Sequence, residues 1–153
     1  LNQHPRIIPH LKFILILGGI FMKYQVGQSA SVSKTITETD VYLFAGVTGD
    51  LNPAHINEVY ASGTHFKHRI AHGMLSAGLI SATLGMQLPG PGSIYMGQML
   101  KFLAPVYIGD TVTATVTIKE LIVEKNRAVL TTEVTNQDGV VVTTGEATAL
   151  LPV

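Results

Sequence analysis

One apolar stretch, residues 72–88, most constrains the fold of this 153-residue chain. Its apolar residues recur at helical spacing, and Pro89-Gly90-Pro91-Gly92 directly after it predicts an abrupt end to a helix. The residues expected on or near one face of this helix are Met74, Leu75, Gly78, Leu79, Ala82 and Met86. An apolar helix must be covered, so the rest of the chain has to pack around it.

The segments that follow this helix predict strands. Alternating Val, Thr, Ile and aromatic residues fill residues 93–103, 111–124, 127–136 and 140–151, and Asp138-Gly139 is typical of a hairpin turn. Earlier in the chain, residues 28–36 predict a strand, and residues 37–48 and 57–62 predict short helices. The simplest way to bury the apolar helix is a curved antiparallel sheet wrapped around it, which is an α+β fold.

The composition narrows the class of protein. Hydrophobic residues make up 46% and charged residues 13%, a balance typical of a chain that hides part of its surface in an oligomer. Ten basic and ten acidic residues give a formal net charge of +0, and no basic stripe with interleaved aromatics suggests nucleic-acid binding. The absence of cysteine excludes disulfides, thiolate nucleophiles and Cys-ligated metals.

The N-terminal segment differs from the rest. Its apolar run, residues 13–22, is too short to span a bilayer, and no clean cleavage site supports its faint likeness to a signal peptide. Met22 opens a sequence typical of a domain start, and the codons of Gly18-Gly19 can spell a ribosome-binding site. We therefore expect residues 1–21 to be a non-native upstream extension or a disordered N-terminus. Residues 22–153 are expected to form the domain, in the cytoplasm and without a membrane partner.

Polar residues that could take part in acid–base chemistry are concentrated at two places in the sequence. Asp50, Asn52 and His55 lie within six residues, and the pair His72-Gly73 opens the apolar helix. A base, a second acid/base group and a backbone N–H at a helix start are what proton transfer beside a carbonyl requires. Structural roles remain open for all of them, because Asp and Asn are common turn residues and His55 lies near a helix start.

The stretch Phe44 to His55, FAGVTGDLNPAH, with Ala61 beyond it, resembles the signature of MaoC-like (R)-specific enoyl-CoA hydratases. That signature is an aromatic residue, a small spacer, Gly-Asp-x-Asn-Pro-x-His and then a small residue. Further stretches that look like family landmarks are His72-Gly73-Met74, Gly90-x-Gly92-Ser93-Ile94-Tyr95 and Gly145-Glu146-Ala147. The resemblance covers roughly residues 24–152, with Ala54 standing where the family usually has a larger aliphatic residue.

The resemblance implies a hot-dog fold, in which an antiparallel β-sheet wraps around a central α-helix. It also implies a homodimer or larger homo-oligomer, with a continuous sheet and active sites near the interface. The implied activity is that of a hydro-lyase of fatty acid metabolism, the reversible syn hydration of trans-2-enoyl-CoA to (R)-3-hydroxyacyl-CoA. Coenzyme A then enters as part of the acyl-CoA substrate, and neither a separate cofactor nor a metal is expected.

The resemblance also assigns roles to residues. Asp50 matches the base that orients and deprotonates water, and we expect burial to raise its pKa. His55 matches the second catalytic residue, which holds the water and shares proton delivery. The expected substrate-binding residues are Asn52, which orients water or a catalytic side chain, Gly73, whose N–H binds the thioester oxygen, and Ser81, in a supporting role.

Other interpretations of the same pattern stay open. The runner-up reactions are dehydration of 3-hydroxyacyl carrier protein, with the same residues run in reverse, and acyl-CoA thioesterase hydrolysis on the same fold. A module that binds acyl thioesters without catalysis is a third. The basic cluster Lys67, His68 and Arg69 has the charge to meet carrier phosphates, although a solvated loop is the simpler interpretation. His72 is expected to be a structural histidine.

Overall fold

The computed structural model describes residues 23–152, so the predicted extension at residues 1–21 lies outside the described residues. Its elements are, in order, β1 (Ser29–Thr35), α2 (Glu38–Thr48), α3 (Pro53–Ile56), α4 (Glu58–Ser62), α5 (Gly73–Met86), β2 (Ile94–Phe102), β3 (Thr111–Ile122), a 3-10 turn (Val123–Lys125), β4 (Arg127–Thr135) and β5 (Val141–Leu150). The predicted strands and helices agree with these bounds to within two residues. The short helix α3 is the one α-helix among them that the sequence did not predict.

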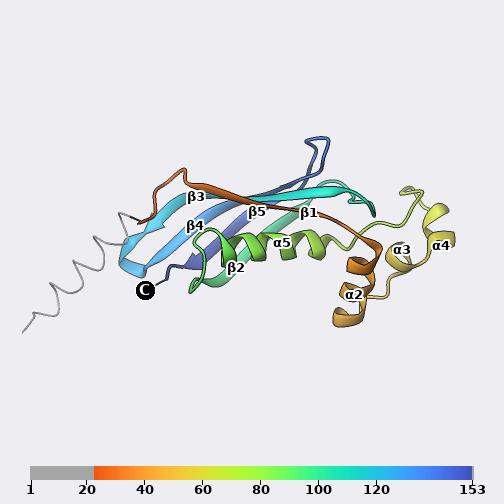
Figure 1. Ribbon diagram of the computed structural model, residues 1–153, viewed down its shortest axis with the longest axis horizontal. Coiled ribbons are helices and arrows are strands. Elements are labelled where there is room, and N and C mark those ends of the chain that lie inside the picture. Colours follow the sequence, from red (N-terminus) through yellow and green to blue (C-terminus); the bar gives the residue numbers. More distant parts are fainter. Residues whose placement is uncertain (1–22, 153) are drawn as a thin grey trace, which may run out of the picture.

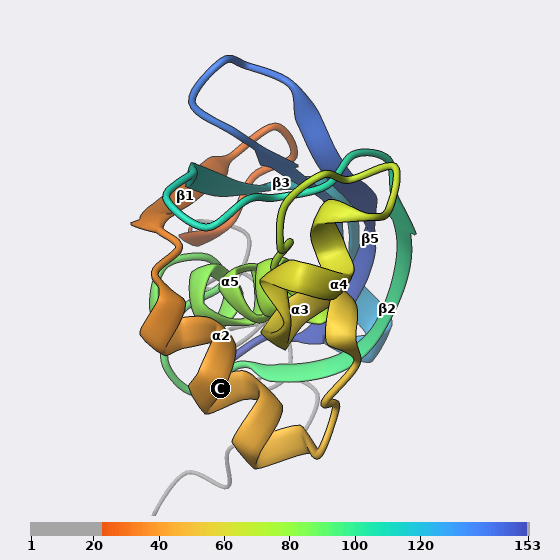
Figure 2. The same ribbon diagram turned by 90° about the vertical axis from the view of Figure 1, so that its right-hand side faces the viewer.

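The five strands form one antiparallel sheet in the order β1-β3-β4-β5-β2. Helix α5 lies along one face of this sheet, and α2, α3 and α4 gather beyond one end of it (Figure 1). Seen along the helix, the sheet curves around α5 (Figure 2). The expected α+β arrangement of a sheet wrapped around a central helix is therefore confirmed.

The core lies between this helix and the concave face of the sheet. On β3 every second residue is buried: Val112, Ala114, Val116 and Ile118. Their neighbours, such as Thr113 and Thr117, point outward and exchange hydroxyl hydrogen bonds with Ser33 and Ser29 of β1. This alternation has the period of two that a half-buried strand requires.

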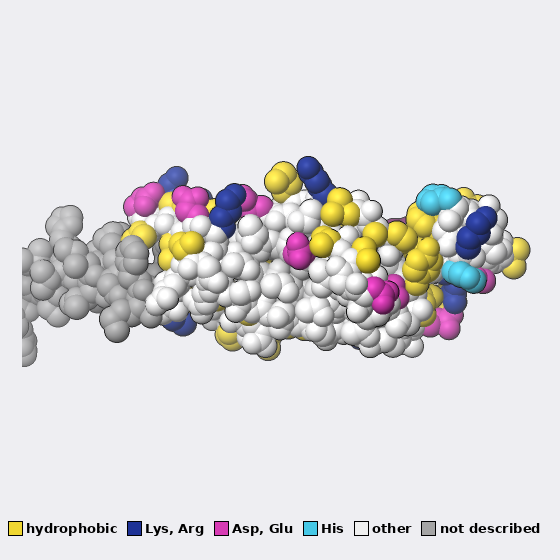
Figure 3. Space-filling view, turned by 90° about the horizontal axis from the view of Figure 1, so that it is seen from above, with side chains coloured by type: hydrophobic (Ala, Val, Ile, Leu, Met, Phe, Trp, Pro, Cys, Tyr) yellow, Lys and Arg dark blue, Asp and Glu magenta, His cyan; other side chains and the backbone are white. Residues whose placement is uncertain are grey.

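The outer surface carries no dominant charge. On the face shown in Figure 3, acidic and basic side chains are interspersed and most of the remaining surface is polar or backbone. This distribution gives no electrostatic footprint for a nucleic acid on that face. Among residues 23–152, no helix is long and apolar enough to cross a membrane.

The predicted face of α5 is confirmed in part, since Leu75 and Leu79 are partly buried against the core. The residues that α5 buries are Ser76, Ala77, Ile80, Thr83 and Leu84, whereas Met74 and Met86 are 55% and 68% exposed. The helix is apolar or small on nearly every side, so periodicity alone does not select the face that packs against the sheet. The hydroxyl of Thr83 keeps a hydrogen-bond partner although it is buried, because it donates to the carbonyl of Leu79 at 2.8 Å.

Gly145 explains how closely β2 approaches β5. It pairs with Leu100 across the two strands, and a Cβ at this position would collide with the carbonyl oxygen of Met99. The landmark at residues 145–147 therefore has a structural role, because only glycine lets the edge strand pack here.

We predict that Gly145→Ala lowers the free energy of unfolding by about 1–3 kcal/mol, the usual cost of overpacking. Gly46→Ala is the matched control, since a Cβ there meets nothing within 4 Å and the helix gains an alanine. Chemical denaturation of both variants measures the difference. Equal stability of the two variants would contradict the close-approach role of Gly145.

Candidate active site

The segment that holds Asp50 begins where helix α2 ends. Gly49 adopts a left-handed conformation with φ of 76°, and its N–H donates to the carbonyl of Ala45 at 2.8 Å. This is a standard glycine cap, which stops the helix and turns the chain. The N–H of Asp50 then donates to the Thr48 hydroxyl at 3.2 Å. The helix end thus fixes the main chain of Asp50 from its N-terminal side.

The next three residues start a new helix. The side-chain oxygen of Asn52 accepts the N–H of Ala54 at 3.1 Å and caps α3, whose first residue is Pro53. Asp50 Oδ1 in turn accepts the N–H of Asn52 at 3.2 Å. The turn roles that the sequence left open for Asp50 and Asn52 are therefore real. They also hold the Asp50 carboxylate in place while Oδ2 stays outside the turn.

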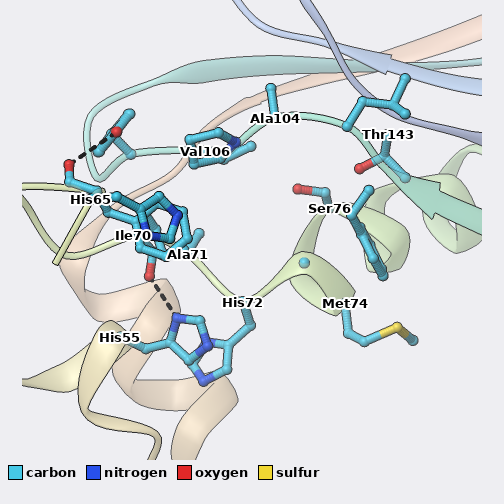
Figure 4. Close-up of a pocket in the computed structure, with 16 residues that line it drawn as sticks. His55, His65, Ile70, Ala71, His72, Met74, Ser76, Ala104, Val106 and Thr143 are labelled. Atoms are coloured by element: carbon cyan, nitrogen blue, oxygen red, sulfur yellow. Dashed lines mark hydrogen bonds between the residues drawn. The ribbon is translucent and has the colours of Figure 1, made fainter. Parts of the chain in front are cut away.

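His55 lies on α3, one turn after the cap, and its ring is oriented by the main chain. Its Nδ1–H donates to the carbonyl oxygen of Ile70 at 2.8 Å (Figure 4). A carbonyl oxygen can only accept, so Nδ1 carries the proton and Nε2 keeps its lone pair. The ring lines a cavity of about 590 Å³, with its basic nitrogen available for chemistry.

His72 connects the two residues. It is 2% exposed, and its Nε2–H donates to the main-chain oxygen of Asp50 at 3.0 Å. Its ring lies against that of His55, with centroids 3.9 Å apart, and against Phe44 at 4.8 Å. The Nδ1 of His72 is buried and has no hydrogen-bond partner among residues 23–152. The expected structural histidine therefore positions both Asp50 and His55.

Together these side chains form one polar cluster. One donor atom from each of Asp50, His55 and His72 lies within 4.8 Å of the other two. A tetrahedral zinc site with bonds of about 2.0–2.2 Å needs donors closer together, at roughly 3.3–3.6 Å. One nitrogen of each imidazole is also engaged by a main-chain carbonyl. The cluster suits acid–base chemistry better than metal binding, and the absence of a metal stays a prediction.

Gly73 adds a backbone donor to the same cavity. It is the first residue of α5, so its N–H has no acceptor within the helix. A Cβ on Gly73 would lie 2.9 Å from the ring of Phe102, so any larger residue here would require that ring to move. The cavity wall continues along α5 to Ser76 and across to Thr143 of β5 (Figure 4).

Asp50 differs from expectation. Its side chain is 51% exposed, so the burial that we expected is not found in a single chain. Ser81 also lies apart from the cluster, eight residues beyond Gly73, or about 12 Å along the helix axis. It lines a second cavity of about 570 Å³ between α5 and β2, and Met74 lines both cavities.

Tyr95, the last residue of the landmark at residues 90–95, lines this second cavity. Its hydroxyl donates to Gln98, whose amide donates to Thr132 at 2.9 Å. Burial raises the pKa of Tyr95. The polar groups at this end of the cavity therefore satisfy one another, and a Tyr-x-x-Gln spacing on a strand is too common to have revealed the pair.

Arg69 fastens the segment before His72 to the neighbouring helices. Its guanidinium donates to Glu38 at 2.6 Å and to the Tyr42 hydroxyl at 2.9 Å. The main-chain N–H of Arg69 donates to the Glu58 carboxylate at 3.0 Å. These contacts lower the pKa of Glu38 and of Glu58 and raise that of Arg69. Because His68 also pairs with Glu58, two members of the basic cluster are already engaged and are poor candidates for binding carrier phosphates.

Comparison with known proteins agrees with this geometry. A model of the MaoC-like domain family matches residues 23–141. The chain belongs to this family. An (R)-specific enoyl-CoA hydratase of Rhodospirillum rubrum is 61% identical over 132 residues, 86% of this chain and 91% of its own length. Another (R)-specific enoyl-CoA hydratase, from Aeromonas caviae, is 47% identical, over 84% of this chain and 96% of its own length.

Solved structures of MaoC-like proteins confirm the expected hot-dog fold. A crystallised (R)-hydratase from A. caviae superposes with a TM-score of 0.82 at 46% sequence identity. The match covers 84% of this chain and 98% of that one. Such a likeness extends over nearly all of the described residues, including the segment from α2 to α5 that carries Asp50, His55 and His72.

Two variants separate the contacts of His72. His72→Gln keeps an N–H donor within reach of the Asp50 carbonyl but removes the ring, and His72→Phe keeps the ring but removes the donor. We predict that His72→Phe speeds amide hydrogen exchange in residues 49–52 by about two- to tenfold, because the net loss of one hydrogen bond costs about 0.5–1.5 kcal/mol. His72→Gln is expected to preserve protection there. Unchanged exchange in His72→Phe would contradict the positioning role.

Proposed function

We propose that this protein is an (R)-specific enoyl-CoA hydratase, which reversibly adds water to trans-2-enoyl-CoA. The observation that carries the proposal is that the Asp50 carboxylate and a His55 ring whose Nε2 is left as the acceptor have donor atoms within 4.8 Å of each other. His55 lines the same cavity as Gly73, and His72, which precedes Gly73, joins Asp50 to it. The two relatives described above carry this activity in their names, which supports the same reaction here.

The reaction adds one water molecule to the alkene. Asp50 takes a proton from the water as its oxygen bonds to C3, and the C2–C3 π electrons move toward the thioester carbonyl. His55 accepts a hydrogen bond from the second water proton at Nε2 and fixes the orientation of the water. The proton held by Asp50 then bonds to C2. Because oxygen and proton arrive from one side of the alkene, the addition is syn.

Gly73 stabilises the charge that develops on the thioester oxygen. Its free N–H and the positive end of the α5 dipole both favour a negative oxygen at this point. Removing one donor of this kind typically costs about 10²–10³ in rate. The reaction as written needs no cofactor other than the coenzyme A that the substrate carries.

Substitutions at the two catalytic positions test the proposal. We expect purified protein to consume the enoyl-thioester absorbance of crotonyl-CoA without releasing free thiol. In Asp50→Asn and His55→Gln we expect kcat to fall by at least about 10²-fold, since the first variant loses the group that transfers the proton and the second loses the group that orients the water. Asp138→Asn, at an exposed turn, is the control and should keep full activity.

Other outcomes of this assay point to other functions. Free thiol released from crotonyl-CoA would indicate a thioesterase, and no reaction with a folded protein would favour a non-catalytic thioester-binding module. Activity only on carrier-protein substrates would indicate the 3-hydroxyacyl carrier protein dehydratase. The engagement of Arg69 and His68 by acidic side chains leaves little basic surface there for an acidic carrier protein or for the phosphates of coenzyme A, so the support for coenzyme A comes from the names of the two relatives.

We propose further that the protein is a homodimer formed through β2. This strand pairs only with β5, and its outer edge has no partner among residues 23–152. The exposed apolar residues that it carries are Ile94, Tyr95, Met96, Met99 and Phe102. β1, at the opposite edge, is instead rich in serine, threonine and lysine. An exposed apolar edge favours pairing with a second copy, which would also lie beside the second cavity. The cytoplasmic location stays a prediction.

Met99→Lys tests the dimer, because a charge on an edge strand opposes pairing. We predict a dimer for the wild type and a shift toward monomer in Met99→Lys, measured by sedimentation equilibrium. Val140→Lys, an exposed apolar position at the β4–β5 turn, is the matched control. A wild type that sediments as a monomer, or dissociation by both variants alike, would contradict an interface along β2.

A further inference from the structure

Two hydroxyl groups lie inside the cavity that contains His55 and Gly73. Ser76 is 1% exposed and Thr143 is 2% exposed, and both line this cavity. Figure 4 shows both side chains at the cavity wall, Ser76 on α5 and Thr143 on β5. No residue among 23–152 forms a hydrogen bond with either hydroxyl, unlike Thr83 on the same helix, which bonds to Leu79.

Hydroxyls that line a cavity and have no partner in the protein are available to form hydrogen bonds with a bound ligand. The surrounding wall is otherwise apolar, with Ala71, Phe102, Leu103, Ala104 and Val106 among the residues that form it. In such a wall, two hydroxyls are the type of feature that orients a polar group of a bound molecule.

Both hydroxyls lie close to the reaction centre. Ser76 is three residues after Gly73 on α5, which corresponds to about 4.5 Å along the helix axis. Thr143 pairs with Phe102 across β5 and β2, and the ring of Phe102 packs against Gly73. The carbonyl carbon of a thioester carries two arms, the acyl chain on one side and the sulfur with its pantetheine chain on the other. When the thioester oxygen is bound at the Gly73 N–H, one of these arms therefore lies beside Ser76 and Thr143.

The two cavities differ in what they offer these arms. The second cavity, beyond Met74, has mostly apolar walls, its polar Tyr95 and Gln98 already satisfy each other, and Ser81 is the single hydroxyl that lines it besides Tyr95. It suits the hydrocarbon chain of an enoyl group. The cavity with the free hydroxyls suits an arm that carries hydrogen-bonding groups, and the pantetheine part of coenzyme A has amides a few bonds from the sulfur.

We propose that Ser76 and Thr143 form a hydrogen-bonding subsite for the first amide of the pantetheine arm. This inference rests on the proposed function. A hydroxyl can donate to the amide carbonyl or accept from the amide N–H, so the pair serves both ends of an amide group. The subsite thus holds the pantetheine arm, which is attached to the thioester sulfur on the side away from the acyl chain.

Three crotonyl thioesters test this subsite: crotonyl-CoA, the N-acetylcysteamine thioester, which keeps one amide, and the S-ethyl thioester, which has none. The variant is Ser76→Ala/Thr143→Val, which removes both hydroxyls with little change in volume. We expect kcat/KM to fall about tenfold on the two amide-bearing substrates and to stay unchanged on the S-ethyl thioester. An equal loss on all three, or no loss on any, would overturn the proposal.

Thermal unfolding supplies a second measurement. Because the hydroxyls are unpartnered, the double variant should unfold at the same temperature as the wild type or a higher one, whereas a lower temperature would indicate a structural role and overturn the subsite. If the double variant does not fold, the same three substrates are tested with Ser76→Ala and Thr143→Val separately. Thr144→Val, on the opposite face of β5, is the control. A wild type without activity on crotonyl-CoA would instead refute the proposed function.

Discussion

The structure depends on the burial of one helix whose first turn must stay accessible. Most of α5 is covered by a sheet that curves around it, and this covering supplies the core. The start of the helix is not covered by the sheet. There the segment from α2 to His72 closes the end of the domain, and Arg69 holds that segment through Glu38 and Glu58. The unpaired N–H groups of a helix start are thereby kept next to a cavity instead of being filled by the core.

The residues of the signature first determine the course of the main chain. Gly49 stops one helix, and Asn52 with Pro53 starts the next, so the chain between them has little freedom. His72 then ties this turn to the start of α5 by one hydrogen bond and one ring contact. The structural and chemical interpretations of these residues are therefore not alternatives. A carboxylate or imidazole can act in proton transfer only when its position is fixed, and the local folding of the motif provides that.

Much of this could be predicted because the signals are local. Strand alternation in the C-terminal half and the helix stop at residues 89–92 gave the fold, and the spacing of Asp50 and His55 gave a cluster that the structure brings together. What failed depends on packing between distant segments. The sheet determines which face of α5 is buried, and the segments that cover α2 determine how exposed Asp50 is. The pairing of β5 with β2 brings Thr143 to the cavity that Ser76 also lines. No sequence window contains both partners of these contacts.

The central claim is that Asp50 and His55 act on one water from one side of the alkene. Hydration of crotonyl-CoA in deuterated water tests it, because the new C–D bond at C2 and the hydroxyl at C3 record the face of each addition. The account predicts (R)-3-hydroxybutyryl-CoA with one deuterium at C2, placed by syn addition, as read by NMR of the product. Deuterium placed by anti addition would contradict the arrangement of these two residues around a single water, and an (S) product would contradict the proposed (R) specificity.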